Sequence, residues 1–331
     1  MKDKTLAILK QARPQLIAHL QRHAPAVDTH DLTISLYHAQ GRSRSTYLLH
    51  SSGGDYILSV HSPETRSALE LQHGYKQHLT ALGVPVVPQI GPFFEVPGIA
   101  TACEITRFCP GKNFESLDEL NPKQLQHYTD FLVANHKAPR YQPPRHLAPG
   151  KTVDAKYPHN FLHYDIAPWN LLYDEQDNIV GLIDFEHCRE GRLASDIIGN
   201  LDRDLKTQCD ANGSPTAHLT DNACHFLQQY QAQRPMQADE RRYFERSLCR
   251  IARERFETAY QQQGGDITAP AFMAAMDKTI AGMHQQLATA LPPHRPILHQ
   301  LKNFGNSFQS RIESKQPRRD SGEVHPSFHA R

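Results

Sequence analysis

The chain has 331 residues, and its 36 Lys and Arg against 35 Asp and Glu leave a net charge of +1. This balance gives no electrostatic reason for binding nucleic acid or an anionic membrane, so we expect a small-molecule partner. Six cysteines are scattered without a CxxC pair, and no apolar run approaches the ~20 residues of a membrane helix, so we expect a reduced, cytoplasmic protein.

The first hundred residues predict one helix followed by a small sheet. Residues 1–22 have the apolar spacing of a single amphipathic helix. A Ser-Ser-Gly-Gly-Asp turn separates two later β-rich runs, as in a hairpin. A helix ended by Gly83 and a strand pair within residues 90–108 follow. The expected strands are Leu32–His38, Thr46–His50 and Tyr56–Val60, and the expected helix is Thr65–Leu82.

Beyond Pro110-Gly111 the pattern changes to helices. We therefore expect an N-terminal lobe over residues 1–104, a hinge over 105–112 and a helical C-terminal lobe over 113–313. Residues 314–331 are charged and nearly free of apolar side chains, so we expect a disordered tail. Residues 137–162 are rich in proline and predict a loop. The expected helices are Asn121–His136, Asp196–Lys206, Asn222–Gln231, Ala238–Gln263 and Ala269–Leu291.

The stretch from Phe161 to Cys188 gathers oxygen-bearing side chains at one place. Asp165 follows His163 by two positions, and Asn170 follows Asp165 by five. Two strand-like runs, residues 169–173 and 179–183, predict a hairpin that brings the chain back and delivers Asp184. Two carboxylates and one carboxamide are therefore expected at one end of this hairpin.

This arrangement suits metal-assisted phosphoryl transfer, which needs positioned groups, a divalent cation and a carboxylate that accepts the proton of the attacking hydroxyl. We assign Asp165 as the base and His163 as a brace of its loop. Asn170 and Asp184 offer the oxygen ligands that Mg²⁺ prefers. Each residue taken alone is also typical of a turn, strand end or helix cap, so the joint pattern carries the hypothesis.

The segment HYDIAPWNLLYDEQDNIVGLIDFEH resembles the catalytic loop and metal-binding hairpin of the aminoglycoside phosphotransferase and choline kinase superfamily. The resemblance implies an α+β, two-lobed, protein-kinase-like fold with an antiparallel sheet lobe and a mainly helical lobe. It implies ATP and Mg²⁺ as cofactors and a small-molecule acceptor, aminoglycoside-, amino-alcohol- or homoserine-like, phosphorylated on a hydroxyl. Phe185-Glu186 stands where protein kinases have Phe-Gly, which favours a small-molecule kinase.

The resemblance also implies where the nucleotide binds. Residues 41–47 are similar to the turn that covers the nucleotide, and residues 104–107 to the segment that meets adenine. In this family a strand Lys or Arg contacts the phosphates and pairs with a helix Glu. Here Ser59 and Gln72 occupy those positions, with Glu70 close by. The candidate nucleotide-binding residues are therefore Arg42, Arg44, Ser59, Thr106 and Arg107, with Arg66 as a further source of positive charge.

Acidic and aromatic side chains near the motif suit an amino-bearing acceptor. The candidates to line its pocket are Trp169, Glu186, Asp202 and Asp204. Trp169 has the alternative of packing under the catalytic loop, and the two aspartates that of a solvated helix face. Asp196 resembles the family's helix-starting aspartate and equally fits a simple N-cap.

Two other functions remain open from the sequence. Ser59 and Gln72 also fit a catalytically weak pseudokinase or a nucleotide-binding regulatory protein. A kinase acting on protein hydroxyls is disfavoured, because only twelve positions separate Asp184 from Asp196 and leave little room for an activation loop.

Overall fold

The computed structural model describes residues 2–37, 45–61, 66–99, 102–147, 158–209, 215–262, 267 and 270–291. Residues Met1–Leu291 form one compact unit, and Pro292–Arg331 form a second unit that lies outside the described residues. The tail expected over residues 314–331 therefore also lies outside them.

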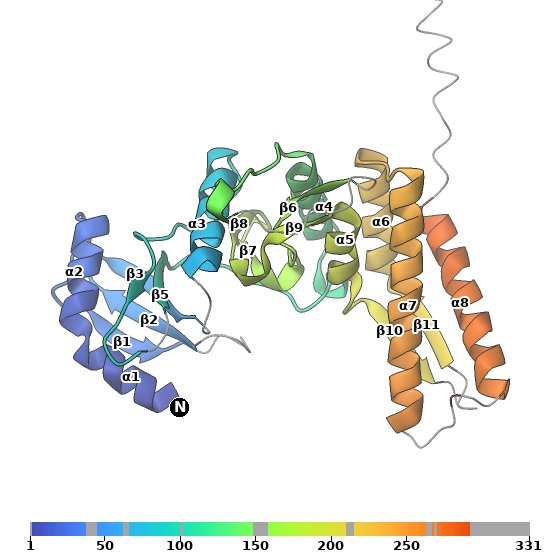
Figure 1. Cartoon of the computed structure of the whole chain (residues 1–331), viewed down its shortest axis with the longest axis horizontal. Coiled ribbons are helices and arrows are strands. Elements are labelled where there is room, and N and C mark those ends of the chain that lie inside the picture. Colours follow the sequence, from blue (N-terminus) through green and yellow to red (C-terminus); the bar gives the residue numbers. More distant parts are fainter. Residues whose placement is uncertain are drawn as a thin grey trace, which may run out of the picture. The chain divides into compact units, whose positions relative to one another are not determined.

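The N-terminal region forms two helices, α1 (Lys2–Gln11) and α2 (Arg13–His23). The prediction of one helix was wrong because Pro14 falls here: its ring fits the first turn of a helix but clashes inside a continuous one. Leu9, Leu16 and Leu20 are fully buried in a cluster with the residues of the first sheet. Figure 1 shows the two helices lying along that sheet.

The first sheet is antiparallel and has five strands in the order β1-β2-β3-β5-β4. Side chains alternate across it, so that Leu58 and Ile105 face α1 and α2 while Ser59 and Glu104 lie on the opposite face. The predicted strands and strand pair are confirmed with small shifts of their ends. The strands are β1 (Thr33–Leu36), β2 (Ser45–Ser51), β3 (Gly54–Val60), β4 (Phe94–Glu95) and β5 (Ala102–Arg107).

Helix α3 (Arg66–Ala81) lies between β3 and β4 in the chain, and Gly83 follows it with a left-handed φ of 78°. Its buried Tyr75 and Leu79 belong to the large core cluster of the C-terminal half, where Tyr75 stacks edge-on to Phe161 at 4.8 Å. The segment after α3 also contacts the C-terminal half, because the Leu182 backbone N–H donates to the Pro85 carbonyl at 2.7 Å.

Four of the five helices expected in the C-terminal half are confirmed, and the fifth, expected over Asp196–Lys206, runs from Leu193 to Leu201. Capping explains where two of them begin. Asn121 and Gln124 form a capping box at the start of α4 (Pro122–Lys137), and the Thr220 hydroxyl accepts from the Ala223 amide at the start of α6. Together these two helices bury Leu125, Tyr128 and Phe226 in the core. The other helices are α5 (Leu193–Leu201), α6 (Asp221–Gln233), α7 (Ala238–Gln262) and α8 (Pro270–Ala290).

In the part of the chain that the structure describes, three two-stranded sheets lie among these helices, and the sequence predicted only one of them. The predicted hairpin is β7 (Leu171–Tyr173) with β8 (Ile179–Leu182). The pair β6 (His159–Leu162) and β9 (Arg189–Arg192) was missed because residues 137–162 read as loop. The pair β10 (Leu205–Cys209) and β11 (Pro215–Leu219) was missed because the helix expected over Asp196–Lys206 ends early, at Leu201.

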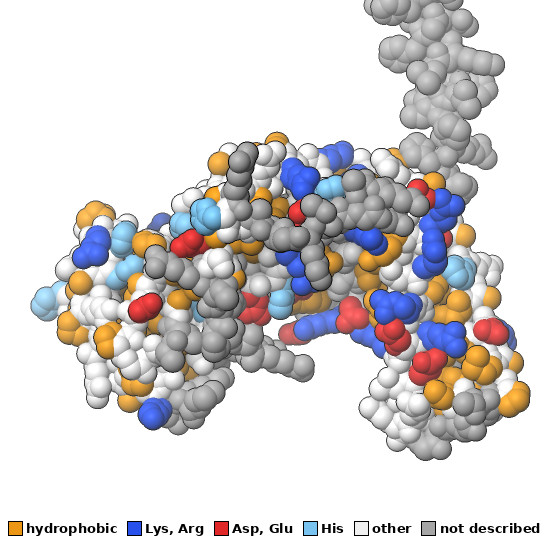
Figure 2. Space-filling view, in the orientation of Figure 1, with side chains coloured by type: hydrophobic (Ala, Val, Ile, Leu, Met, Phe, Trp, Pro, Cys, Tyr) orange, Lys and Arg blue, Asp and Glu red, His pale blue; other side chains and the backbone are white. Residues whose placement is uncertain are grey.

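The architecture confirms the predicted α+β fold, an antiparallel sheet lobe followed by a mainly helical region (Figure 1). Figure 2 shows Lys and Arg side chains beside Asp and Glu side chains on the viewed face of the helical region, as the near-neutral charge leads one to expect. Within the described ranges, no helix combines the length and apolar character that crossing a bilayer requires.

Candidate active site

The loop predicted to be catalytic, residues 163–170, begins where β6 ends and is held by buried side chains. His163 is fully buried, and its Nε2 donates to the Ile183 carbonyl at 2.9 Å, across the loop. Tyr164 follows in a left-handed conformation, φ 68°, and the Arg189 guanidinium lies 3.8 Å from its ring centroid. A Cβ at Gly191 would approach the Tyr164 ring to 2.2 Å, so only glycine fits there.

Asp165 and Asn170 contact each other directly. The Asn170 Nδ2 donates to the Asp165 carboxylate at 2.8 Å and to the Asp165 carbonyl at 2.9 Å. The short helix η3 (Pro168–Asn170) holds the Asn170 side chain beside Asp165, because the backbone N–H of Asn170 donates to the Ala167 carbonyl at 2.9 Å. With Nδ2 used twice in this way, the Oδ1 of Asn170 is directed away from these bonds and offers an oxygen ligand.

Asp184 lies at the same end of the hairpin as Asn170. The Ile183 amide donates to the Asn170 carbonyl at 3.0 Å, so the residue before Asp184 pairs with Asn170 itself. Asp184 has a left-handed backbone, φ 65° and ψ 67°, which turns the chain into η4 (Phe185–His187). The backbone pairing thus brings Asp165, Asn170 and Asp184 together, as the sequence predicts.

The environment of Asp165 changes its acidity. Burial raises the pKa of the Asp165 carboxyl above its usual value, and hydrogen bonds from Trp169 and Asn170 partly counteract this. The Trp169 indole N–H donates to the carboxylate at 3.4 Å. A partly buried carboxylate with a raised pKa and two neutral donors is a candidate general base.

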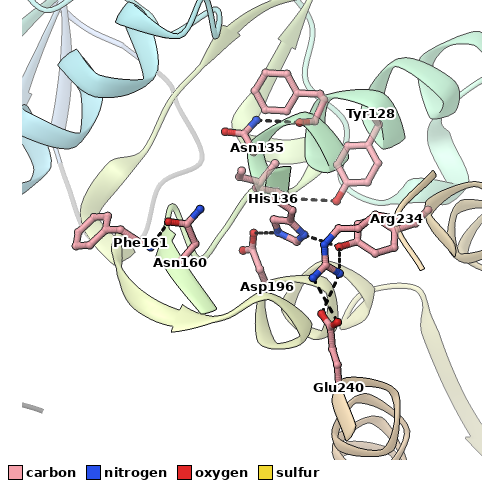
Figure 3. Close-up of polar contacts among 11 residues, drawn as sticks. Tyr128, Asn135, His136, Asn160, Phe161, Asp196, Arg234 and Glu240 are labelled. Carbon is pink, nitrogen blue, oxygen red and sulfur yellow. Dashed lines mark hydrogen bonds and ion pairs between the residues drawn. The ribbon is translucent and has the colours of Figure 1, made fainter. Parts of the chain in front are cut away.

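A hydrogen-bonded chain joins helices α4, α5, α6 and α7 (Figure 3). Arg234 donates to the Tyr230 hydroxyl at 3.0 Å and pairs with Glu240 at 2.9 Å. The Tyr230 hydroxyl contacts His136 Nδ1 at 2.6 Å, and His136 Nε2 contacts the Asp196 carboxylate at 3.1 Å. In the same region Tyr128 donates to the carbonyl of Ile166, next to Asp165, at 2.9 Å.

Asp196 is therefore not an N-cap, contrary to that interpretation of the sequence. Arg192 occupies the N-cap position of α5, and Asp196 lies inside the helix with no exposed surface. Its partner is His136 of α4. The sequence showed the aspartate but not the histidine 60 positions before it, because such a pair exists only once the helices have packed.

The nucleotide side differs from the expectation in several places. Ser59 lies near the end of β3, directly opposite Glu104 of β5. Because β5 extends to Arg107, residues 105–107 are strand residues, and the connection expected over 105–112 begins at Phe108. Alternation along β5 places Thr106 and Arg107 on opposite faces, so their side chains do not share one site. Arg42, Arg44 and the side chain of Arg66 lie outside the described residues.

A charged cluster on the same face of β3 and β5 was missed. Lys76 of α3 forms an ion pair with Glu104, and His61 Nε2 contacts the other oxygen of that carboxylate at 3.1 Å. Burial alone would raise the pKa of Glu104, but the Lys76 charge and the His61 hydrogen bond hold it far below its usual value. The available signals were a lysine on the apolar face of α3, between Leu69 and Leu79, and a glutamate inside a buried strand.

Two of the acceptor-pocket candidates are occupied by other contacts. Asp204 is fully buried and accepts from the Leu117 and Asp118 amides at 3.1 and 3.2 Å, so it caps η1 (Leu117–Glu119) and lines no pocket. The alternative of a solvated face is wrong for it as well. Asp202 pairs with Arg255 at 2.6 Å. Trp169 packs against Arg203, whose guanidinium lies 4.1 Å from the indole.

Comparison with known proteins agrees with this geometry. The family model described as the phosphotransferase enzyme family matches residues 36–151 and 143–212, more than half of the chain. No curated protein sequence matches the chain.

Two solved structures have a similar fold. One is a Ralstonia eutropha JMP134 protein provisionally described as an aminoglycoside phosphotransferase, 15% identical, with a TM-score of 0.52 over 83% of this chain and 97% of that chain. The other is a microcompartment-associated aminopropanol kinase, 14% identical, with a TM-score of 0.51 over 83% and 96% of the respective chains. The chain belongs to the phosphotransferase enzyme family, and it shares the fold of these two structures.

Proposed function

We propose that this enzyme transfers a phosphoryl group from ATP to a hydroxyl of a small molecule, with Asp165 as the base. The observation that carries the proposal is the contact of Asn170 with Asp165, combined with the pairing of Asn170 and Ile183 that brings Asp184 beside them. A base and two oxygen ligands at one end of a rigid hairpin meet the geometric demands of in-line phosphoryl transfer.

The donor set fits a hard divalent cation. Asp184 supplies a carboxylate and Asn170 supplies its Oδ1, since Nδ2 is already bonded to Asp165. Oxygen ligands from one or two side chains, completed by substrate phosphates, are the usual protein environment of Mg²⁺. When bound there, Mg²⁺ neutralises charge on the phosphates. Asp165 orients the acceptor hydroxyl and takes its proton on a carboxylate oxygen.

The acceptor is proposed to be an amino-bearing molecule of the aminoglycoside, amino-alcohol or homoserine type. Glu186, which follows the metal hairpin and keeps some exposed surface, is the remaining acidic candidate to face its amine. A protein substrate is disfavoured, because η4, β9 and the start of α5 occupy the whole stretch from Asp184 to Asp196.

Nucleotide use is tested by thermal unfolding with and without Mg²⁺. We expect ATP with Mg²⁺ to raise the Tm and AMP to leave it nearly unchanged, because only the triphosphate reaches the metal ligands. Asp184→Asn should abolish the Mg²⁺-dependent part; it keeps a residue type that tolerates the left-handed backbone. No response of the wild-type protein to ATP at any Mg²⁺ concentration would refute the proposal.

Turnover is tested with a panel of amino alcohols, aminoglycosides and hydroxy amino acids. Once an acceptor is found, Asp165→Asn should leave ATP binding near the wild-type value and reduce kcat by about 100-fold or more, as expected for loss of a general base. Unchanged kcat would show that Asp165 is not the base.

A second candidate function is a family member that binds nucleotide with little turnover, and Ser59 of β3, at the position expected to carry the phosphate-binding cation, favours it. The two candidates differ in one result. ATP stabilisation without phosphorylation of any acceptor in the panel supports the second, and phosphorylation of any acceptor rejects it.

A further inference from the structure

The face of the sheet that meets α3 lacks a cation on its strands. Ser59 is the last-but-one residue of β3, and in the register of the sheet its partner is Glu104 of β5. Ser59, His61 and Glu104 are all buried. A carboxylate among a serine and a histidine in such a place needs a positive partner, because an unpaired buried charge is strongly unfavourable.

That partner comes from the helix. Lys76 of α3 forms the ion pair with Glu104, and the two side chains are only 10% and 2% exposed. Buried pairs contribute little net stability, because both ions lose their hydration, and apolar residues of similar size often serve as well. Stability alone therefore does not explain why Lys76 and Glu104 occupy these buried positions. A function that needs the positive charge of Lys76 would explain it.

Lys76 also lies beside the proposed metal-binding turn. Its Nζ is 5.2 Å from the ring centroid of Phe185, the residue that follows Asp184. The ammonium thus lies between β5 and this turn, in contact with residues of both. A lysine ammonium has three N–H donors, so bonds to Glu104 and, at 3.5 Å, to the Gln89 side-chain oxygen leave one donor for an anionic oxygen.

We propose that Lys76 supplies the cation that contacts the nucleotide phosphates, and that Glu104 holds its ammonium in place. The ion pair expected from the family resemblance has a lysine or arginine on the strand and a glutamate on the helix. Here the helix carries the lysine and the strand carries the carboxylate. This inference rests on the proposed function, since it names the phosphate-binding residue of the same site. It also accounts for Ser59, because a second lysine there would place two cations on one carboxylate.

The test compares ATP with adenosine, which lacks the phosphates, by calorimetric titration of the full chain with Mg²⁺. Lys76→Met should weaken ATP binding by on the order of 30-fold, the usual effect of removing one partner of a buried charge pair, and leave adenosine affinity nearly unchanged. Lys123→Met is the matched control, because Lys123 of α4 is exposed and bonds only the Gln176 carbonyl in the described structure. It should change neither affinity.

A double variant separates phosphate binding from simple charge compensation. Lys76→Met with Glu104→Gln leaves no uncompensated buried charge, so its Tm should be close to that of the wild type even if Lys76→Met alone unfolds. Its ATP affinity should stay low. Wild-type ATP affinity in either stable variant would overturn the inference, while absence of ATP binding by the wild-type protein would overturn the proposed function itself.

Discussion

At the residue scale, Asp165 shows how one side chain is tuned by its neighbours. Burial raises the pKa of its carboxyl, whereas the Trp169 indole and the Asn170 amide stabilise the charged form. The proposed base would work only when deprotonated, so activity should fall as pH falls through this raised pKa. The acid limb of the pH profile therefore reports directly on these contacts.

We expect Trp169→Phe to move the acid limb of kcat/KM to higher pH. The phenyl ring keeps an aromatic surface but loses the N–H that stabilises the Asp165 carboxylate, so the pKa rises further. The measurement is the pH profile with an identified acceptor. Arg203→Gln is the control, because it removes the stacking on Trp169 and leaves the indole hydrogen bond. An unmoved limb, or an equal movement in the control, would contradict the assignment.

At the element scale, the Asp204 carboxylate has a structural role. It joins the turn before β10 to the start of η1 through two backbone amides. Asp204→Ala should lower the free energy of unfolding by about 1–3 kcal/mol, because both amides lose their acceptor in a buried place. Urea denaturation measures this. Asp202→Ala is the control: its half-exposed ion pair with Arg255 should contribute about 1 kcal/mol at most.

The same variant has a definite pH dependence. Burial raises the pKa of Asp204 to about 6, while its two amide bonds pull the other way. In the unfolded chain the pKa is near 4, so between about pH 4 and 6 the folded state binds a proton that the unfolded state lacks. Stability from this group therefore rises as pH falls through that window. The loss in free energy of unfolding caused by Asp204→Ala should be larger at pH 4 than at pH 7. A smaller loss at pH 4 would contradict the pKa shift.

The elements that sequence patterns predicted are those governed by local signals. Asn121 with Gln124 marks the start of α4, and Gly83 marks the end of α3. The elements that were missed depend on distant partners. β6 is a strand because β9 pairs with it about 30 positions later, and no local signal contains that information. The ion pair of Lys76 with Glu104 was missed for the same reason.

At the scale of the whole molecule, the described residues have two main apolar clusters. One contains Leu58 and joins the first sheet to α1 and α2, while the other contains Leu132 and joins α3 to the C-terminal helices. The catalytic loop and hairpin belong to the second cluster through Phe161 and Leu182. The helix that carries Lys76 is thus anchored to the catalytic half, and the strand that carries Glu104 to the other.

We expect Leu58→Ala and Leu132→Ala each to cost about 2–5 kcal/mol, but in different regions. Hydrogen exchange followed by mass spectrometry should show faster exchange in β2, β3 and β5 for Leu58→Ala, with α4 and α6 less affected. Leu132→Ala should produce the reverse pattern. Equal acceleration of both regions in both variants would mean that residues 1–291 open only as one cooperative unit.

The bond between Trp169 and Asp165 has a practical consequence. Trp169 is the only tryptophan among the 331 residues, so the intrinsic indole fluorescence of the protein arises beside the proposed base. Its emission senses the charge on that carboxylate and the packing of Arg203 on the ring. The unlabelled protein therefore carries its own optical reporter, with which arrival of metal, nucleotide or acceptor can be followed in real time.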